Sequence, residues 1–444
     1  MATERASLAF AFASLLCSAA PARADWAHLV QACGAAAKQS TSAAAPAASA
    51  RNGLSIKDLN THGAALISKW DKRYPWEDCI LKLTGLQTIA PVFGSLGPGG
   101  GMALGARSEH EINSGRVQSL LAGRALMSFT GSYVAEARYD VMMPSIGQWH
   151  AATATFEDQI IISPFVRRAD LKALPFYGLG PATRASAGTE YREQRTEAGV
   201  IGSVPLASWL SAGGGITSLA PAIDQVPQPH VLDSQAFVRL HTPTRTAQTA
   251  HRHEARLTYD AYSDRASGGG SFRRLQLFAL GSYELRRPLA DPFADRSWFQ
   301  NVLCQPIVGD ECRAGNLVVD ALITTSFTRA GRTIPFYLQD TLGGTDREGF
   351  DTLRGLDDLR LRAANRALLQ AEFYKDVNGW FGVFAFVDAG TVASDAAGLW
   401  SGAWRHDYGP GIFVRAGGHI VVRAFVAFGG GEGVHRSLRF ASGL

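Results

Sequence analysis

The stretch Leu317-Val-Val-Asp-Ala-Leu-Ile-Thr-Thr-Ser-Phe327 alternates between two kinds of side chain. Its odd positions are mostly apolar, while Asp320, Thr324 and Ser326 stand among the even ones. A β-strand sends successive side chains to opposite faces, so this period of two predicts a strand with one apolar and one polar face. Three other segments alternate in the same way: Tyr133–Val141, His253–Ala261 and Ala367–Phe373.

Similar short segments, separated by Gly, Pro, Asp and Asn, fill residues 86–444. Alternation alone fits either a soluble sandwich with its apolar face inside or a membrane barrel with that face toward lipid. Many segments reach about nine residues, which matches tilted transmembrane strands of ~9–11 residues better than soluble strands of ~5–6. At about 22 residues per strand and connection, this region would hold ~16 strands. The sequence therefore predicts an all-β fold, a 16-stranded antiparallel transmembrane β-barrel over residues 86–444.

The N-terminal residues resemble a targeting segment. Arg5 precedes the apolar stretch Leu8–Leu16, and Ala22-Arg-Ala24 offers the small residues of a cleavage site. This pattern predicts a signal peptide over residues 1–24, with a cytosolic N-terminal helix as the alternative. No later run of 18 apolar residues predicts a membrane helix. An exported barrel is expected in the bacterial outer membrane, in contact with its lipids.

Residues 25–85 differ from the rest of the chain. Residues 34–52 are rich in Ala and Ser and predict a flexible linker, while residues 54–85 predict one or two short helices. At the other end, residues 418–428 and 437–444 read as strands, so we expect the last strand to pair with the first.

Four cysteines follow the predicted signal peptide, and four cysteines allow three disulfide connectivities. The short spacing favours Cys304–Cys312, which leaves Cys33–Cys79; free thiols or another pairing remain alternatives. The net charge of +4 on 444 residues does not predict a nucleic-acid partner.

Motifs of enzymes are missing from the sequence. It contains no Gly-x-Ser-x-Gly elbow, no phosphate-binding Gly-x-x-x-x-Gly-Lys loop and no His-Glu-x-x-His. His251 and His253 share one strand face but form only a weak candidate for a metal site. We therefore expect no catalytic residues, no metal and no cofactor.

Four motifs occur in a fixed order near the C-terminus: Pro335–Thr345, Thr352–Leu356, Ala367–Phe373 and Phe384–Val392. Together they resemble the bacterial surface antigen family, the barrel of outer-membrane assembly factors of the BamA/TamA type and, more distantly, of two-partner secretion transporters. The resemblance is firm over residues 330–444 and looser over residues 86–444. It implies a 16-stranded barrel whose sixth extracellular loop folds inward.

The resemblance also implies an arginine lock. The Arg-Gly motif of that loop matches Arg354-Gly355, and the acids that hold the arginine match Glu372 and Asp388. The residues allow this, because a guanidinium binds a carboxylate through two parallel hydrogen bonds and glycine permits close backbone approach. Glu372 lies on the polar side of its segment, and Asp388 is expected at the end of the apolar segment 381–387. In the alternative reading, Arg354 is solvated and residues 388–390 form a turn that ends the strand.

The sequence departs from the family in three places. Residues 346–351 are an extra segment within the loop, and the chain ends in Leu444 with Phe440 as the last aromatic residue. Roughly 60 residues lie between the predicted signal peptide and the barrel, too few for a series of POTRA modules. The resemblance implies insertion or translocation of protein or lipid, with a separate periplasmic partner in place of the POTRA modules. A passive pore or a structural surface barrel without insertase activity is the alternative.

Overall fold

The computed structural model describes residues 89–114, 117–144, 159–224, 229–242, 251–265, 270–288, 305–306, 311–347, 349–377, 380–416 and 419–440. The predicted signal peptide (1–24) and the predicted linker and helices (25–85) lie outside these ranges. Cys33, Cys79 and Cys304 lie outside them as well. Cys312 is described only as backbone at the start of a strand, so the disulfide pairing stays a prediction.

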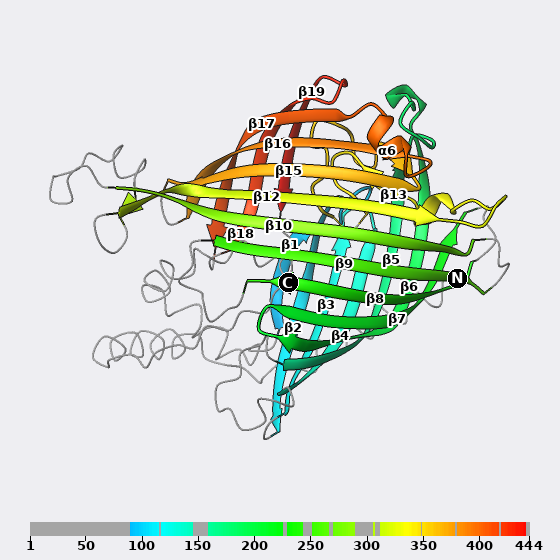
Figure 1. Ribbon diagram of the computed structural model, residues 1–444, viewed down its shortest axis with the longest axis horizontal. Helices are drawn as coiled ribbons and strands as arrows, with labels where there is room; N and C mark the ends of the chain where they lie inside the picture. The colour runs from blue at the N-terminus through cyan, green and yellow to red at the C-terminus, as the bar shows by residue number, and fades with distance from the viewer. Residues whose placement is uncertain are drawn as a thin grey trace, which may run out of the picture.

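Sixteen strands form one nearly closed antiparallel barrel, in which each strand pairs with the next along the chain (Figure 1). The predicted fold class and strand number are therefore confirmed. The strands are β1 (Ile89–Ser95), β2 (Met102–Ser114), β3 (Val117–Ser128), β4 (Tyr133–Pro144), β5 (Gln159–Phe176), β6 (Thr189–Ala207), β7 (Leu210–Ile223), β8 (Val231–His241), β9 (His251–Asp264), β10 (Phe272–Pro288), β12 (Glu311–Phe327), β15 (Asn365–Asp376), β16 (Phe381–Ala393), β17 (Arg405–Ala416), β18 (His419–Gly429) and β19 (Val434–Phe440).

All four segments chosen for their alternation are strands, in β4, β9, β12 and β15. Side chains on β16 show how the two faces differ. Val383 and Val387 are 39% and 56% exposed on the outer face, whereas Phe384, Phe386 and Asp388 are buried on the inner face. Exposed apolar residues continue over the other strands, which gives the barrel a wide apolar exterior.

The inner face is not polar throughout, which corrects the simple division into an apolar outer and a charged inner side. Phe384, Phe386, Phe413 and Phe425 form a buried cluster on the inner face of β16–β18. Glycines make room for these rings, since a Cβ on Gly382 would lie 2.1 Å from the Phe413 ring. Buried aromatic rings here give the wall a packed inner surface, against which the chain between β12 and β15 lies.

Residues 328–364, here called the long loop, connect β12 to β15. The loop contains a small sheet of β13 (Asp340–Leu342) and β14 (Leu361–Ala363). Its leucines pack with wall residues into one buried cluster: Leu342, Leu353, Leu356, Leu361, Ala363, Leu368 and Val392. Because Leu368 and Val392 belong to β15 and β16, the loop shares a hydrophobic core with the barrel wall.

Closure of the barrel brings its first and last strands together, as the sequence suggested. β1 and β19 lie beside each other, and the rings of Phe93 and Phe440 meet edge to face with centroids 4.7 Å apart. Within the described residues no ladder pairs these two strands. Residues 441–444 lie outside the described ranges, so the expected pairing of first and last strands stays a prediction. The seam between β1 and β19 is the one junction between neighbouring described strands that lacks a ladder.

Short elements complete the described chain. β11 (Gln305–Pro306) pairs with the start of β12, and α6 (Gly398–Ser401) lies between β16 and β17. Two 3-10 turns, η4 (Ala185–Ala187) and η6 (Phe336–Leu338), lie in connections that follow β5 and β12. None of the helices in the described ranges has the length and apolar character needed to cross a membrane.

Candidate functional site: an arginine clamp beneath the long loop

Arg354 of the long loop lies against the inner face of the barrel and is only 1% exposed. Its Nε donates to Asp388 Oδ2 at 2.7 Å, and its Nη2 pairs with the second oxygen of the same carboxylate. Nη1 pairs with Glu372 on the neighbouring strand. The planar guanidinium thus binds one carboxylate through two parallel hydrogen bonds and a second carboxylate from the side. Arg354, Glu372 and Asp388 are called the clamp below.

Aromatic and amide groups complete the surroundings of the clamp. The Arg354 guanidinium carbon lies 3.8 Å from the centroid of the Phe386 ring, a favourable cation–π contact in a dry site. Gln370 donates at 3.0 Å to Asp388 Oδ1 and also at 3.0 Å to the Thr352 carbonyl oxygen. Burial opposes the charge of Arg354, but the two carboxylates outweigh this effect and raise its pKa above the ordinary value. The clamp is therefore a charged, buried ion pair.

Asp388 lies within its strand, which rules out the alternative reading of residues 388–390 as a turn that ends the strand. β16 continues to Ala393, and residues 389–393 remain paired with β15. The carboxylate therefore extends from the middle of a strand whose backbone is held on both sides. This position keeps it in a fixed place, which a turn at residues 388–390 would not do.

Gly355 is needed for the close approach of the loop to the wall. A Cβ at this position would lie 2.7 Å from Cβ of Asp407, which is itself fully buried on β17. Asp407 stands directly opposite Asp388 in the ladder, so a third carboxyl group lies beside the clamp. Across β12, β15, β16 and β17, the register aligns Asp320, Gln370, Asp388 and Asp407 in one polar row.

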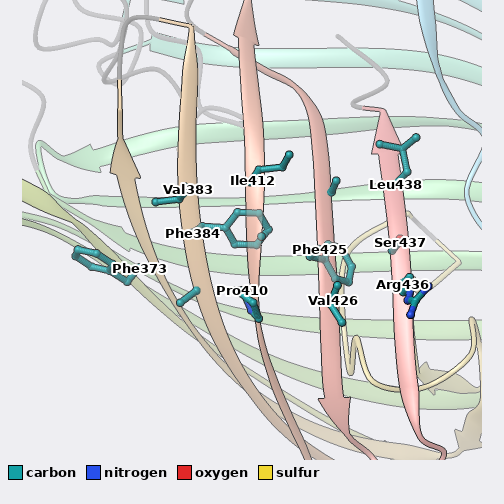
Figure 2. A pocket seen from close by; sticks show the side chains of 13 residues that line it. Phe373, Val383, Phe384, Pro410, Ile412, Phe425, Val426, Arg436, Ser437 and Leu438 are labelled. Atoms are coloured by element: carbon teal, nitrogen blue, oxygen red, sulfur yellow. The ribbon is translucent and has the colours of Figure 1, made fainter. Parts of the chain in front are cut away.

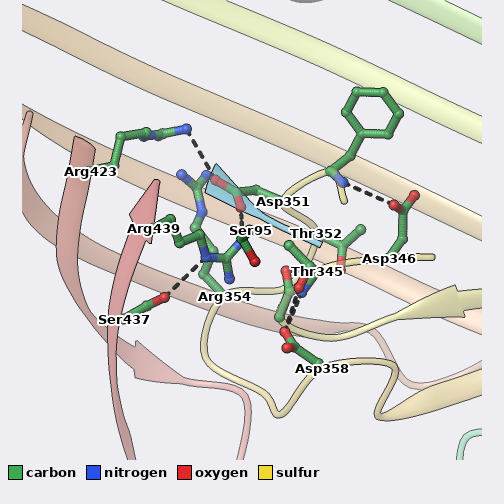
Figure 3. Close-up of polar contacts among 12 residues, drawn as sticks. Ser95, Thr345, Asp346, Asp351, Thr352, Arg354, Asp358, Arg423, Ser437 and Arg439 are labelled. Atoms are coloured by element: carbon green, nitrogen blue, oxygen red, sulfur yellow. Dashed lines mark hydrogen bonds and ion pairs between the residues drawn. The ribbon is translucent and has the colours of Figure 1, made fainter. Parts of the chain in front are cut away.

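A second ionic contact joins the long loop to the last two strands (Figure 3). Asp351 accepts from Arg423 of β18 at 3.1 Å and also pairs with Arg439 of β19. Arg423 in turn donates at 2.8 Å to Glu372, so the two sites share a carboxylate–arginine chain. Asp351 belongs to the extra segment 346–351, whose effect on the loop is thus an added attachment to the strands next to the seam.

The other side of the loop reaches the opposite part of the barrel. Arg347 pairs with Glu193 of β6. Arg360 donates to the hydroxyl and the carbonyl oxygen of Thr183, both at 2.6 Å, and pairs with Glu432. The loop is therefore held at β6, at the connection after β5, and at β15–β19.

The sequence and the structure agree on four residues of the site. Arg354, Gly355, Glu372 and Asp388 come together, while Asp351, Phe386, Asp407 and Arg423 were not foreseen. Asp407 and Arg423 belong to none of the four motifs, and only the strand register places them beside the clamp. Phe386 lies two residues before Asp388 on the same face of β16, and Asp351 belongs to the long loop. In the described ranges, no group of three or more His, Cys, Asp and Glu side chains is arranged to hold a metal ion.

Several solved structures of other proteins are similar to this chain. No family model and no curated protein matches the chain. It is similar to BamA from Haemophilus ducreyi lacking POTRA domains 1-3, at 14% identity over 80% of this chain and 69% of that chain, with a TM-score of 0.49. It is also similar to CdiB from Acinetobacter baumannii, at 10% identity over 80% of this chain and 59% of that chain, with a TM-score of 0.46. A third similar structure is CdiB from Escherichia coli, at 13% identity over 80% of this chain and 60% of that chain, with a TM-score of 0.45.

This chain thus spans about 60% of either CdiB structure. BamA is among the assembly factors that the motifs of residues 330–444 resemble. The identities are low, and the barrel assignment rests on the ladders of this chain itself.

Replacing Arg354 by alanine is expected to lower the free energy of unfolding by ~3–5 kcal/mol, because Asp388 is left as an unpaired buried charge. Arg354→Lys should recover only part of this loss, since lysine cannot form the two parallel hydrogen bonds. A urea titration read from gel mobility of unboiled samples measures the effect. The control Arg138→Ala removes a half-exposed arginine paired with Asp140 and should cost about 1 kcal/mol or less. A wild-type urea midpoint for Arg354→Ala would contradict the clamp.

Replacing Asp351 by asparagine keeps its size but removes the charge that pairs with two arginines. We expect amide hydrogen exchange in β18 and β19 to become about tenfold faster, corresponding to ~1.4 kcal/mol in local opening, with no change in β3 and β4. Asp395→Asn is the control, because Asp395 is exposed and accepts from the Gly398 amide far from the seam. Unchanged exchange in both last strands would show that the Asp351 contact does not hold them.

Proposed function

We propose that this chain is a barrel of the bacterial outer membrane that inserts or translocates protein or lipid, with the β1–β19 seam as its moving part. The observation that carries the proposal is the contrast between this seam and every other junction. Fifteen junctions are held by ladders, whereas β1 and β19 meet through side chains such as Phe93 and Phe440. A barrel built this way opens at one place.

The energies of the two kinds of junction support this reading. The β1–β2 ladder has seven residue pairs, and each backbone hydrogen bond contributes a net ~0.5–1.5 kcal/mol. An aromatic pair adds only ~0.5–1.5 kcal/mol beyond its buried area. Opening the seam therefore costs less than opening any neighbouring junction. Unpaired strand edges are costly in hydrocarbon, so an incoming extended segment would satisfy them.

The long loop holds in place the strands on one side of the seam. The clamp holds the loop to β15 and β16, and Asp351 holds it to β18 and β19. The wall that ends at the seam is thus supported from inside while the seam itself is weak. On this proposal the loop side is the extracellular side, and residues 25–85 or a separate periplasmic partner deliver the cargo. The proposal assigns no catalytic role to any residue.

A passive pore or structural barrel is the second candidate. Ion pairs such as Arg124–Glu136 and Arg239–Glu254 give part of the inner face the polar character of a pore lining. Against a wide pore stands the loop, which is attached both to β6 through Arg347 and to β16 through Arg354. A chain segment held at both walls narrows the path between them.

Locking the seam tests the proposed function. Phe93→Cys with Phe440→Cys places two thiols across it, and a short cleavable thiol cross-linker joins them. In cells that lack the native gene, we expect the cross-linked barrel to leave outer-membrane protein and lipid profiles defective, and cleavage of the linker to restore them. Leu104→Cys with Met127→Cys is the control, because these residues already face each other in the β2–β3 ladder.

The outcomes separate the two candidates. Full activity of the seam-locked barrel, or unchanged membrane profiles on deletion of the gene, would contradict an insertase. A large steady conductance of the wild-type barrel in planar bilayers, unaffected by the seam lock, would instead favour the passive pore.

A further inference from the structure

A groove of about 800 Å³ runs over β15–β19, next to the seam (Figure 2). Most of its lining side chains belong to the outer, exposed face of the barrel: Phe373, Val383, Ala385, Pro410, Ile412, Ala424, Val426, Arg436 and Leu438. The phenylalanine cluster fills the opposite side of the same strands. Phe384 and Phe425 of that cluster also border the groove, while its other large side chains lie on the exterior of the barrel.

Small residues create the groove. Ala385 and Pro410 stand opposite each other in the β16–β17 ladder, and Ala424 lies one strand further. Larger side chains, Phe373 on β15 and Leu438 on β19, border this low region. A depression with an apolar lining of this size and shape fits a hydrocarbon chain better than a polar ligand.

Arg436 is the charged member of the lining. It lies on the outer face of β19 between Val434 and Leu438, which are 56% and 60% exposed. An arginine on the lipid-facing side of a barrel is costly at the midplane and less so near the interfaces. No carboxylate or other acceptor pairs with Arg436 among the described residues. The side chains on either side of it, His435 and Ser437, are less exposed, although Ser437 also borders the groove.

We propose that this groove binds a phosphorylated membrane lipid, with its phosphate on Arg436 and one acyl chain along Ala385, Pro410 and Ala424. Charge complementarity selects the ligand, because phosphate is the anion that lipids bring to this surface and guanidinium binds it through paired hydrogen bonds. The apolar lining then accommodates the chain. The inference requires only that the barrel lies in a membrane, and it does not depend on transport through the seam.

Native mass spectrometry of the full chain in detergent tests the site with two probes. Dioleoyl phosphatidic acid carries the phosphate, and dioleoylglycerol carries the same chains without it. We expect the wild type to retain phosphatidic acid, and Arg436→Leu to bind it about tenfold or more weakly while its weak binding of dioleoylglycerol is unchanged. Arg436→Lys should keep part of the preference, since the charge remains.

A second pair of variants tests the groove itself. Ala385→Phe fills it and should weaken phosphatidic acid binding, whereas Ala389→Phe on the same strand and outer face, outside the lining, should not. Ile412→Trp fills the groove from β17 if Ala385→Phe does not fold.

Equal binding by wild type and Arg436→Leu would show that Arg436 only reaches toward water, and would overturn the proposal. Equal binding of phosphatidic acid by Ala385→Phe and Ala389→Phe would show that the acyl chain does not lie in the groove. A seam-locked barrel should still bind the lipid, so failure of the proposed transport function leaves this result unchanged.

Discussion

The structure depends on one buried ion pair, the guanidinium of Arg354 between the carboxylates of Asp388 and Glu372. Water cannot replace a missing partner there, so each member fixes the others. Because Arg354 belongs to the long loop and the acids belong to β15 and β16, the pair ties a connecting segment to the wall. The shared leucine cluster stabilises the contact, but apolar packing does not depend on direction. The planar hydrogen bonds of the guanidinium therefore set the position of the loop.

Because of this attachment, the wall of the barrel is held more strongly at some strand junctions than at others. Near the clamp, the wall is supported by ladders, by packed phenylalanines and by the contacts of Asp351 with Arg423 and Arg439. One strand further, the junction of β19 with β1 has no ladder in the described residues. On the proposed function, rigid support beside a weak junction would direct opening of the wall to the seam. The outer groove with Arg436 lies on the same strands, β15–β19.

Much of the fold could be predicted from sequence, because alternation reports directly on strands that separate two environments. Residues 317–327 and 253–261 show this pattern, and both are strands. Alternation gives no clear signal where both faces of a strand are apolar, as around Phe386 on β16, whose ring lies beneath Arg354 of the long loop. Asp407 and Arg423 were missed for another reason. Their roles depend on cross-strand register, and nothing in the local sequence shows which residues face each other.

The most direct test of the clamp is a double-mutant cycle on Arg354 and Asp388, built from Arg354→Ala, Asp388→Ala and the double variant. The free energy of unfolding of all four proteins gives the coupling between the two side chains. A coupling of about 2 kcal/mol or more is expected, with the double variant less damaged than the sum of the single ones, because each single change leaves one buried charge without its partner. Additive losses, with a coupling near zero, would show that the two residues do not hold the loop together.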